Sequence, residues 1–188
     1  TSATPGPAAP SARAASLTRQ LLAYSGKGRF MPRPLDLSEE VGKVASLLEA
    51  SVPHKVRLLL NLQTGLPRIE ADAAQIQQAV VDLVLNAGEA IGEREGTVEV
   101  SSGVAALDEE AIRQRFADAG ITPGTYLALE VRDDGSGMDE RVQNRIFEPF
   151  FSTKFAGRGL GLPAVQGVVR GHRGAIEVKS SPGKGTTV

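Results

Sequence analysis

Four short stretches of this 188-residue sequence hold residues whose types and spacing could do chemistry. In the first, Asp133 closes a strand-like run and is followed by Gly135, Gly137 and Met138. A carboxylate there can accept a hydrogen bond from an exocyclic amine, and the lack of a side chain at Gly137 would let a flat ring lie against the backbone. The same residues are also typical of a simple Asp-Gly turn, and the motif alone leaves both interpretations open.

The second stretch is rich in glycine and leads into an apolar helical pattern. It consists, in order, of Gly157, Arg158, Gly159, Leu160, Gly161 and Leu162. It does not fit the dinucleotide-binding G-x-G-x-x-G motif, and none of the three Gly-Lys pairs in the chain continues as a P-loop. Free amides at a helix N-terminus favour a phosphate, and Lys154 and Arg158 would add positive charge. A flexible surface loop is the alternative.

The third candidate is Asn86, which interrupts the apolar helical run VVDLVLNA. Asp82 lies four residues earlier and therefore shares its helix face. One oxygen from each side chain would suit a hydrated Mg²⁺ that carries substrate phosphates. A hydrogen-bonded structural Asn is the alternative.

The fourth stretch, residues 146–154 (IFEPFFSTK), contains three of the six phenylalanines. It is typical either of local core or of an apolar latch that holds a mobile loop over a ligand.

The elements that must position these residues alternate irregularly between helix and strand. Apolar periodicity predicts strands near residues 33–37, 56–62, 97–102, 125–134 and 174–181, and helices beginning at Ser38 and spanning about 72–91, 107–119, 139–147 and 160–172. This order predicts an α/β fold, a two-layer α/β sandwich with helices packed on one face of a mixed β-sheet. A further helical stripe near residues 17–24 stands apart behind a Gly/Pro break. It suggests part of a helical bundle, and a helix packed on the domain is the alternative.

Composition excludes several classes of function. Lys and Arg total 21 and Asp and Glu total 22, so the net charge of −1 gives no basic surface for a nucleic acid. The absence of Cys and the presence of only two His argue against disulfides and against thiolate or histidine metal sites. No apolar run approaches the roughly 18 residues of a membrane span, so we expect no membrane contact and a cytoplasmic location, although the parent protein could be membrane-anchored.

The order of these boxes resembles the GHKL (Bergerat) ATP-binding fold, and more narrowly the catalytic domain of bacterial sensor histidine kinases. The likeness covers about residues 33–188 and includes a final Gly-Lys-Gly-Thr box at residues 183–186; Phe-Glu-Pro-Phe-Phe is its most kinase-specific part. The leading SLTRQLLAYSGKGRF resembles the end of a second dimerisation helix. We therefore expect residues 1–28 to be a linker with the end of that helix, residues 29–188 to be the catalytic domain, and the chain to be a piece of a longer kinase.

The resemblance implies ATP or ADP as ligand, with Mg²⁺, and assigns a role to each box. Asp133 would accept from the adenine amine beside Gly135, Gly137 and Met138, and Asn86 would coordinate Mg²⁺. The phosphate region, beneath a lid over about residues 152–160, would comprise Lys154, Gly157, Arg158, Gly159, Leu160, Gly161 and Leu162. Lys154 and Arg158 would stabilise charge near the γ-phosphate, and Thr186 or Thr187 would reach adenine through water.

Two departures from the family pattern affect the expected chemistry. Glu89 stands where many of these kinases carry Lys, which raises the importance of Lys154 and Arg158. Asp82 occupies the position of the water-activating Glu in gyrase-type ATPases, so a small ATPase activity is conceivable. Neither His54 nor His172 stands in an acceptor-helix context, and we expect both to be structural or surface residues.

The leading hypothesis is thus the catalytic half of an ATP-dependent protein-histidine kinase. Its acceptor His would lie on a dimerisation helix absent from this chain, and its partners would be those helices and a response-regulator receiver domain. The alternatives are a GHKL-type ATPase clamp and a non-catalytic nucleotide-binding module. We expect the isolated chain to be a monomer or a weak dimer.

Overall fold

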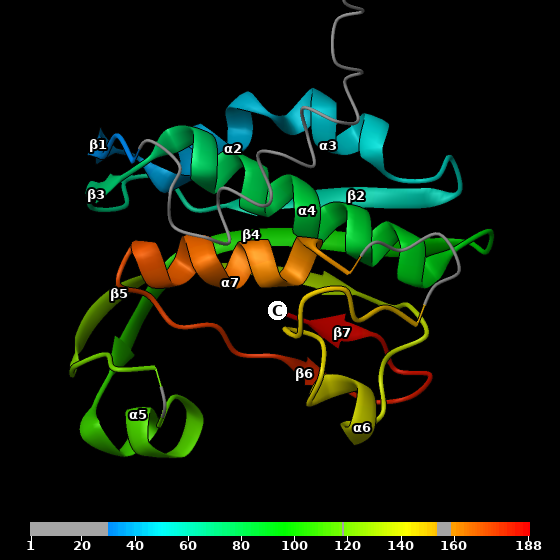
Figure 1. Cartoon of the computed structure of the whole chain (residues 1–188). Coiled ribbons are helices and arrows are strands. Elements are labelled where there is room, and N and C mark those ends of the chain that lie inside the picture. The colour runs from blue at the N-terminus through cyan, green and yellow to red at the C-terminus, as the bar shows by residue number, and fades with distance from the viewer. Residues whose placement is uncertain (1–29, 118, 154–158) are drawn as a thin grey trace, which may run out of the picture.

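The computed structural model describes residues 30–117, 119–153 and 159–188, and the predicted helical remnant within residues 1–28 lies outside them. The elements, shown in Figure 1, are β1 (Arg33–Leu35), α2 (Leu37–Lys43), α3 (Ala45–Ser51), β2 (Val56–Leu62), β3 (Ile69–Ala71), α4 (Ala73–Ile91), β4 (Gly96–Leu107), α5 (Glu109–Arg115), β5 (Gly124–Asp133), α6 (Glu140–Gln143), α7 (Gly161–Gly171), β6 (Lys179–Ser180) and β7 (Thr186–Thr187).

A five-stranded mixed sheet, in the order β2-β4-β5-β7-β6, forms one layer of the molecule. β2 and β4 are parallel, and α4 lies in the connection between them. β4, β5, β7 and β6 then pair antiparallel. β7 is held to the end of β5 by the pairs Arg132↔Thr187 and Asp133↔Thr186, and Val131 and Val188 exchange two backbone hydrogen bonds of 2.9 Å. A separate two-stranded sheet joins β1 to β3.

The helices α2, α3, α4 and α7 make the second layer, and α4 and α7 run side by side across the sheet (Figure 1). α4 begins sharply because the Asp72 side chain accepts hydrogen bonds from the amides of Ala74 and Gln75. Its buried stripe faces the sheet and packs against strand residues such as Val98, Val100 and Val131. The stripe comprises Val80, Leu83, Val84, Ala87 and Ile91. Full burial of one such side chain contributes about 1.5–3 kcal/mol, so this stripe sets the orientation of the helix.

The predicted two-layer α/β sandwich is confirmed, with differences in single elements. The helix predicted to begin at Ser38 begins one residue earlier, at Leu37. Asp36 caps it by accepting from the Glu39 amide, and Ser38 is buried and bonded to Gln63 O and Ser102 Oγ. The predicted strand at residues 174–181 is wrong over most of its length, since only β6 pairs. The predicted helix at 139–147 shortens to α6.

Within the described residues, no helix combines the length and the apolar character that a membrane crossing requires.

α5 lies apart from the helical layer, beyond the ends of β4 and β5 (Figure 1). Arg115 at its C-terminus donates two hydrogen bonds to Glu177, from Nε at 2.9 Å and from Nη2 at 2.5 Å. Lys179 also contacts this carboxylate, at 3.2 Å. The hydrogen bond from Arg115 is the main reason that the pKa of Glu177 is lowered, although partial burial opposes it.

We predict that this ion pair makes stability depend on pH in the acid range. Because the folded-state pKa of Glu177 is lowered, its contribution is complete above the unfolded carboxyl value of about 4.3 and is lost as pH falls through the lower folded value. Glu177→Gln should therefore cost roughly 1 kcal/mol or less in urea denaturation at pH 7, and nothing at the lowest pH. The exposed Glu130 on β5 gives the control, Glu130→Gln. A Glu177→Gln cost that is the same at every pH would contradict this prediction.

Candidate functional site

A cavity of about 680 Å³ opens between α4, the end of β5 and the start of α7. Its lining joins segments far apart in the sequence: one face of α4, the loop after β5, residues on either side of residues 154–158, and β7. All five predicted boxes therefore contribute residues to one cavity. A cavity of this size is within the usual range of a small-molecule or nucleotide site.

Asp133 lies at one end of the cavity and is the last residue of β5. It is buried, and its Oδ1 accepts hydrogen bonds from the amides of Gly135 at 2.7 Å and Thr186 at 3.3 Å. A buried carboxylate is costly unless it is hydrogen-bonded, and these two amides supply that compensation. The same contacts hold the loop after β5 against β7, and they fix the orientation of the Asp133 carboxylate.

The glycines after Asp133 are required by close packing of the chain. A Cβ at Gly135 would approach Asp133 Oδ1 and the Ala90 backbone, and Gly135 does not line the cavity. A Cβ at Gly137 would overlap the carbonyl oxygen of Ser181, so the space beside this residue is taken by the chain itself. Gly137 lines the cavity with its backbone, and the contact of a ligand ring with that backbone stays a prediction.

α4 presents polar side chains to the cavity along a single face. Asp82, Asn86 and Glu89 all line it, at spacings of four and three residues. Asp82 is buried, and its Oδ1 accepts a hydrogen bond of 3.0 Å from Gln78. The Asn86 amide lies beside the start of α7, because a Cβ built at Gly161 would be 3.3 Å from Asn86 Nδ2.

The N-terminus of α7 points its backbone at the same space. Leu160, Gly161 and Leu162 line the cavity, and Leu160 is the N-cap residue. The first amides of a helix have no partner within the helix and carry the positive end of its dipole. Pro163 has no N–H, so the donors that this end can offer come from residues 160–162.

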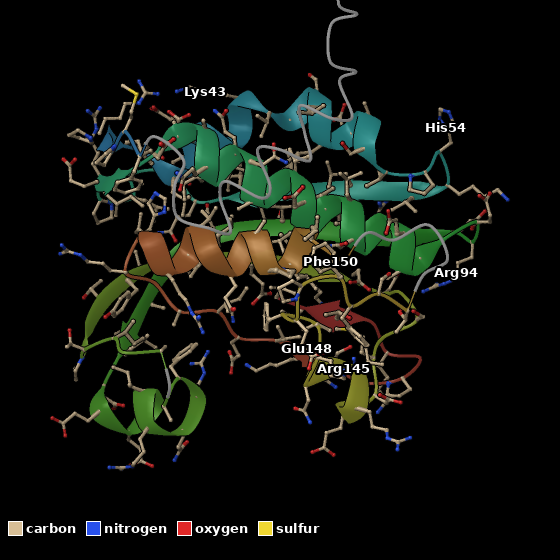
Figure 2. All side chains as sticks on the ribbon, in the orientation of Figure 1. Lys43, His54, Arg94, Arg145, Glu148 and Phe150 are labelled. Atoms are coloured by element: carbon tan, nitrogen blue, oxygen red, sulfur yellow. The ribbon has the colours of Figure 1, made fainter. Side chains whose placement is uncertain are left out.

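Residues 150–153, which follow α6, lie beside Gly159, two residues before α7 begins. The Phe150 amide donates to the Gly159 carbonyl at 2.8 Å, and Phe151, Ser152 and Thr153 line the cavity. Arg145 lies with its guanidinium 4.2 Å from the centre of the Phe151 ring and also bonds Glu148, its neighbour in Figure 2. Phe150 is 73% exposed and has a positive φ of 67°, an uncommon conformation for a bulky residue.

Of the fifteen residues predicted for the site, ten line the cavity. They are Asp82, Asn86, Asp133, Gly137, Met138, Gly159, Leu160, Gly161, Leu162 and Thr186. Gly135 does not, for the packing reason given above, and Thr187 does not because successive strand residues face opposite sides of a sheet. Lys154, Gly157 and Arg158 lie outside the described residues.

Sequence reasoning missed part of the apolar lining, including Ala90, Val131 and Val142, although it singled out the stretch that begins at Ile146. Val142 and Ile146 are four residues apart in a helical pattern, and that spacing was a usable signal. Val131 precedes Asp133 by two residues on β5, so strand alternation also places it on the same face.

The two histidines occupy structural and surface positions, as expected. His54 is exposed in the turn between α3 and β2, at the edge of the molecule (Figure 2). His172 ends α7; its Nε2 accepts from the Asp72 amide at 2.9 Å, and its Nδ1 lies 2.8 Å from Val168 O.

With this geometry established, the chain can be compared with known proteins. The histidine kinase-, DNA gyrase B-, and HSP90-like ATPase family matches residues 71–188. Sensor kinase CckA of Brucella abortus is 36% identical over 177 residues, which are 93% of this chain and 18% of CckA. Sensor histidine kinase ZraS of Klebsiella oxytoca is 36% identical over 152 residues, or 80% of this chain and 29% of ZraS.

Two solved structures show the same fold. Full-length ShkA in complex with AMPPNP superposes with a TM-score of 0.68 at 25% identity, covering 92% of this chain and 34% of ShkA. The histidine kinase ThkA in complex with the response regulator TrrA gives 0.65 at 22% identity, covering 93% of this chain and 45% of ThkA.

The sheet with its helical layer is thus the fold of histidine kinase catalytic domains. The chain belongs to the histidine kinase-, DNA gyrase B-, and HSP90-like ATPase family, and it is homologous to the catalytic ATPase domain of sensor histidine kinases. It spans less than a third of the length of CckA and of ZraS.

We predict that the site depends on the turn before β7. Gly185 has φ +80°, and a Cβ there would overlap the Asp133 carbonyl oxygen; Gly183 has φ +74° with nothing within 4 Å of its Cβ position. Gly185→Ala should therefore lose roughly 2–5 kcal/mol of unfolding free energy through strain and overlap, and Gly183→Ala only about 1–2 through strain. Urea denaturation of both variants measures the difference, and equal losses would show that the space beside Gly185 is not constrained.

Proposed function

We propose that this chain binds Mg·ATP in the cavity and transfers the γ-phosphoryl group to a histidine on a dimerisation helix of its parent protein. The observation that carries the proposal is the arrangement of the cavity, with a buried acceptor carboxylate at one end and a helix N-terminus beside an Asn amide at the other. This arrangement suits a ligand with an amine-bearing base and a polyphosphate. The solved complex of ShkA with AMPPNP supports the same ligand class.

In the proposed binding mode, the adenine amine donates to Asp133 while Met138, Val142 and Ile146 contribute apolar contacts to the base. Thr186 faces the same end of the cavity and would reach the base through water. The backbone amides of residues 159–161 would receive the phosphates.

The donor set at the phosphate end fits a magnesium ion. Asp82, Glu89 and Asp133 give the cavity three carboxylates, and its described lining contains no Lys or Arg, so a polyphosphate would need added positive charge. Mg²⁺ keeps several waters and takes one or two protein oxygens together with substrate phosphates. Asn86 would supply that protein oxygen, and Mg²⁺ would neutralise phosphate charge. Lys154 and Arg158 would supply the remaining charge near the γ-phosphate.

Phosphoryl transfer requires mainly positioning and charge stabilisation, and the proposed residues supply both for the donor. Residues 1–28 would be the linker and the end of the second dimerisation helix, and 29–188 the catalytic domain. The phosphorylated histidine would then pass its group to a response-regulator receiver domain, the class of partner present in the ThkA–TrrA complex.

A second candidate, an ATPase clamp, has one observation in its favour. Asp82 is buried, lines the cavity and accepts from Gln78, so a carboxylate capable of orienting water lies one helical turn from Asn86. Steady phosphate release without any acceptor, lost in Asp82→Asn, would support this function. ATP binding without transfer or hydrolysis would instead indicate a nucleotide-binding module.

We predict that Mg·ADP stabilises the chain through Asp133. At about 100 times its dissociation constant, a ligand that binds only the folded state adds about 2.7 kcal/mol, which a thermal-shift measurement detects as a higher melting temperature. Asp133→Asn should remove this shift, because an amide nitrogen would meet the adenine amine donor to donor. The adjacent exposed Asp134 does not line the cavity, so Asp134→Asn should keep the shift. An Asp133→Asn variant with unchanged affinity would refute the adenine assignment.

We also predict histidine phosphorylation of a separate dimerisation fragment by this chain and γ-labelled ATP. Asn86→Ala should reduce the initial rate by about a hundredfold, since misplaced phosphates are far from reacting geometry. Asn144→Ala, at an exposed asparagine outside the cavity, is the matched control. If the unchanged chain binds Mg·ADP but labels no fragment, the kinase assignment is rejected, and the nucleotide-binding module is the function that remains.

A further inference from the structure

Ser180 lies outside the cavity, yet its hydroxyl connects three groups at the adenine end of the proposed site. Its Oγ accepts from the Met138 amide at 2.8 Å, donates to the Gly185 carbonyl at 3.0 Å and lies 2.9 Å from Thr186 Oγ1. Met138 and Thr186 both line the cavity, whereas Ser180 is half-buried behind them. The serine is thus the common partner of two cavity residues.

Only one distribution of hydrogens satisfies all three contacts. The Met138 amide can only donate, and the Gly185 carbonyl can only accept, so the single hydrogen of the Ser180 hydroxyl goes to Gly185. The contact with Thr186 is then a hydrogen bond only if Thr186 supplies the hydrogen. The Thr186 hydroxyl is therefore committed as a donor to Ser180, and it can offer a ligand in the cavity only its lone pairs.

As a result, the side chains of Asp133 and Thr186 both present hydrogen-bond acceptors near the base. The carboxylate of Asp133 accepts, and its Oδ1 receives the amide of the same Thr186. Adenine presents an amine, which donates, whereas hypoxanthine and guanine present a carbonyl oxygen in its place. A water that bridges the Thr186 hydroxyl and the Asp133 carboxylate would donate one hydrogen to each of these acceptors, so it would face the base as an acceptor. Opposite a carbonyl oxygen, that water and the oxygen would both lack a hydrogen, and such mismatches discriminate strongly.

We propose that Ser180 is a positioning residue that sets base specificity, by holding the Thr186 hydroxyl as an acceptor and so favouring adenine over bases with a carbonyl oxygen in place of the amine. This inference rests on the proposed nucleotide site. It deepens that site, because it assigns selectivity to a residue that touches no ligand.

The test compares the dissociation constants of ADP and inosine diphosphate, by calorimetry, for the chain of residues 1–188. In Ser180→Ala the Thr186 hydroxyl is released and can donate into the cavity, so the preference for ADP should fall by about tenfold. Ser180→Thr keeps a hydroxyl and should restore the preference. Ser181→Ala, at the neighbouring exposed serine, is the matched control and should leave the preference unchanged.

A double-mutant cycle separates this role from general support of the fold. Thr186→Val removes the acceptor and should lower the ADP preference by itself; adding Ser180→Ala should then change the preference no further. A purely structural serine would weaken both nucleotides equally and leave their ratio intact, which would overturn the inference. So would an unchanged ratio in Thr186→Val, a variant that does not depend on whether Ser180→Ala folds.

The failure of the proposed function gives a different result. If the unchanged chain binds neither ADP nor inosine diphosphate, the nucleotide site is wrong and the inference falls with it. If it binds ADP but the variants retain full discrimination, the nucleotide site stands and the role of Ser180 alone is overturned.

Discussion

The two hydrogen bonds that Asp133 Oδ1 accepts, from the amides of Gly135 and Thr186, are the constraint on which the site depends. A carboxylate buried at the end of β5 would destabilise the fold without such donors. Each donor comes from a different segment, so satisfying the charge also joins the loop after β5 to β7. The group that we propose to recognise adenine is therefore also a structural junction, and its orientation follows from backbone geometry.

Around this junction, two helices bring the remaining groups together. The apolar stripe of α4, which includes Val80 and Val84, packs on the sheet and leaves Asp82, Asn86 and Glu89 on the face that lines the cavity. α7 packs beside α4 and begins next to Asn86. The core thus determines the distance between an amide side chain and a helix N-terminus, and the site needs no further element to hold these two groups.

The sequence predicts what local periodicity determines, such as β2, α4 and β5, because continuous apolar patterns of one period define them. It fails where a tertiary contact decides. Residues 174–178 are as apolar as a strand but have no strand partner among the described residues. Ser38 is buried and hydrogen-bonded to Ser102, and the helix there begins one residue before it. The ordered boxes identified ten residues that line the cavity. The packing of Gly135 against Asp133 and Ala90, and the side of the sheet to which Thr187 points, follow only from the three-dimensional arrangement.

The hydrogen bond between the Phe150 amide and the Gly159 carbonyl has a consequence for the length of chain between these two residues. It closes a loop at its base, so the distance between the two ends of that loop does not depend on how many residues lie between them. Doubling the length of a closed loop costs only about 0.6 kcal/mol. A change in the length of this segment should therefore cost little stability, while the start of α7 stays in register with Asn86.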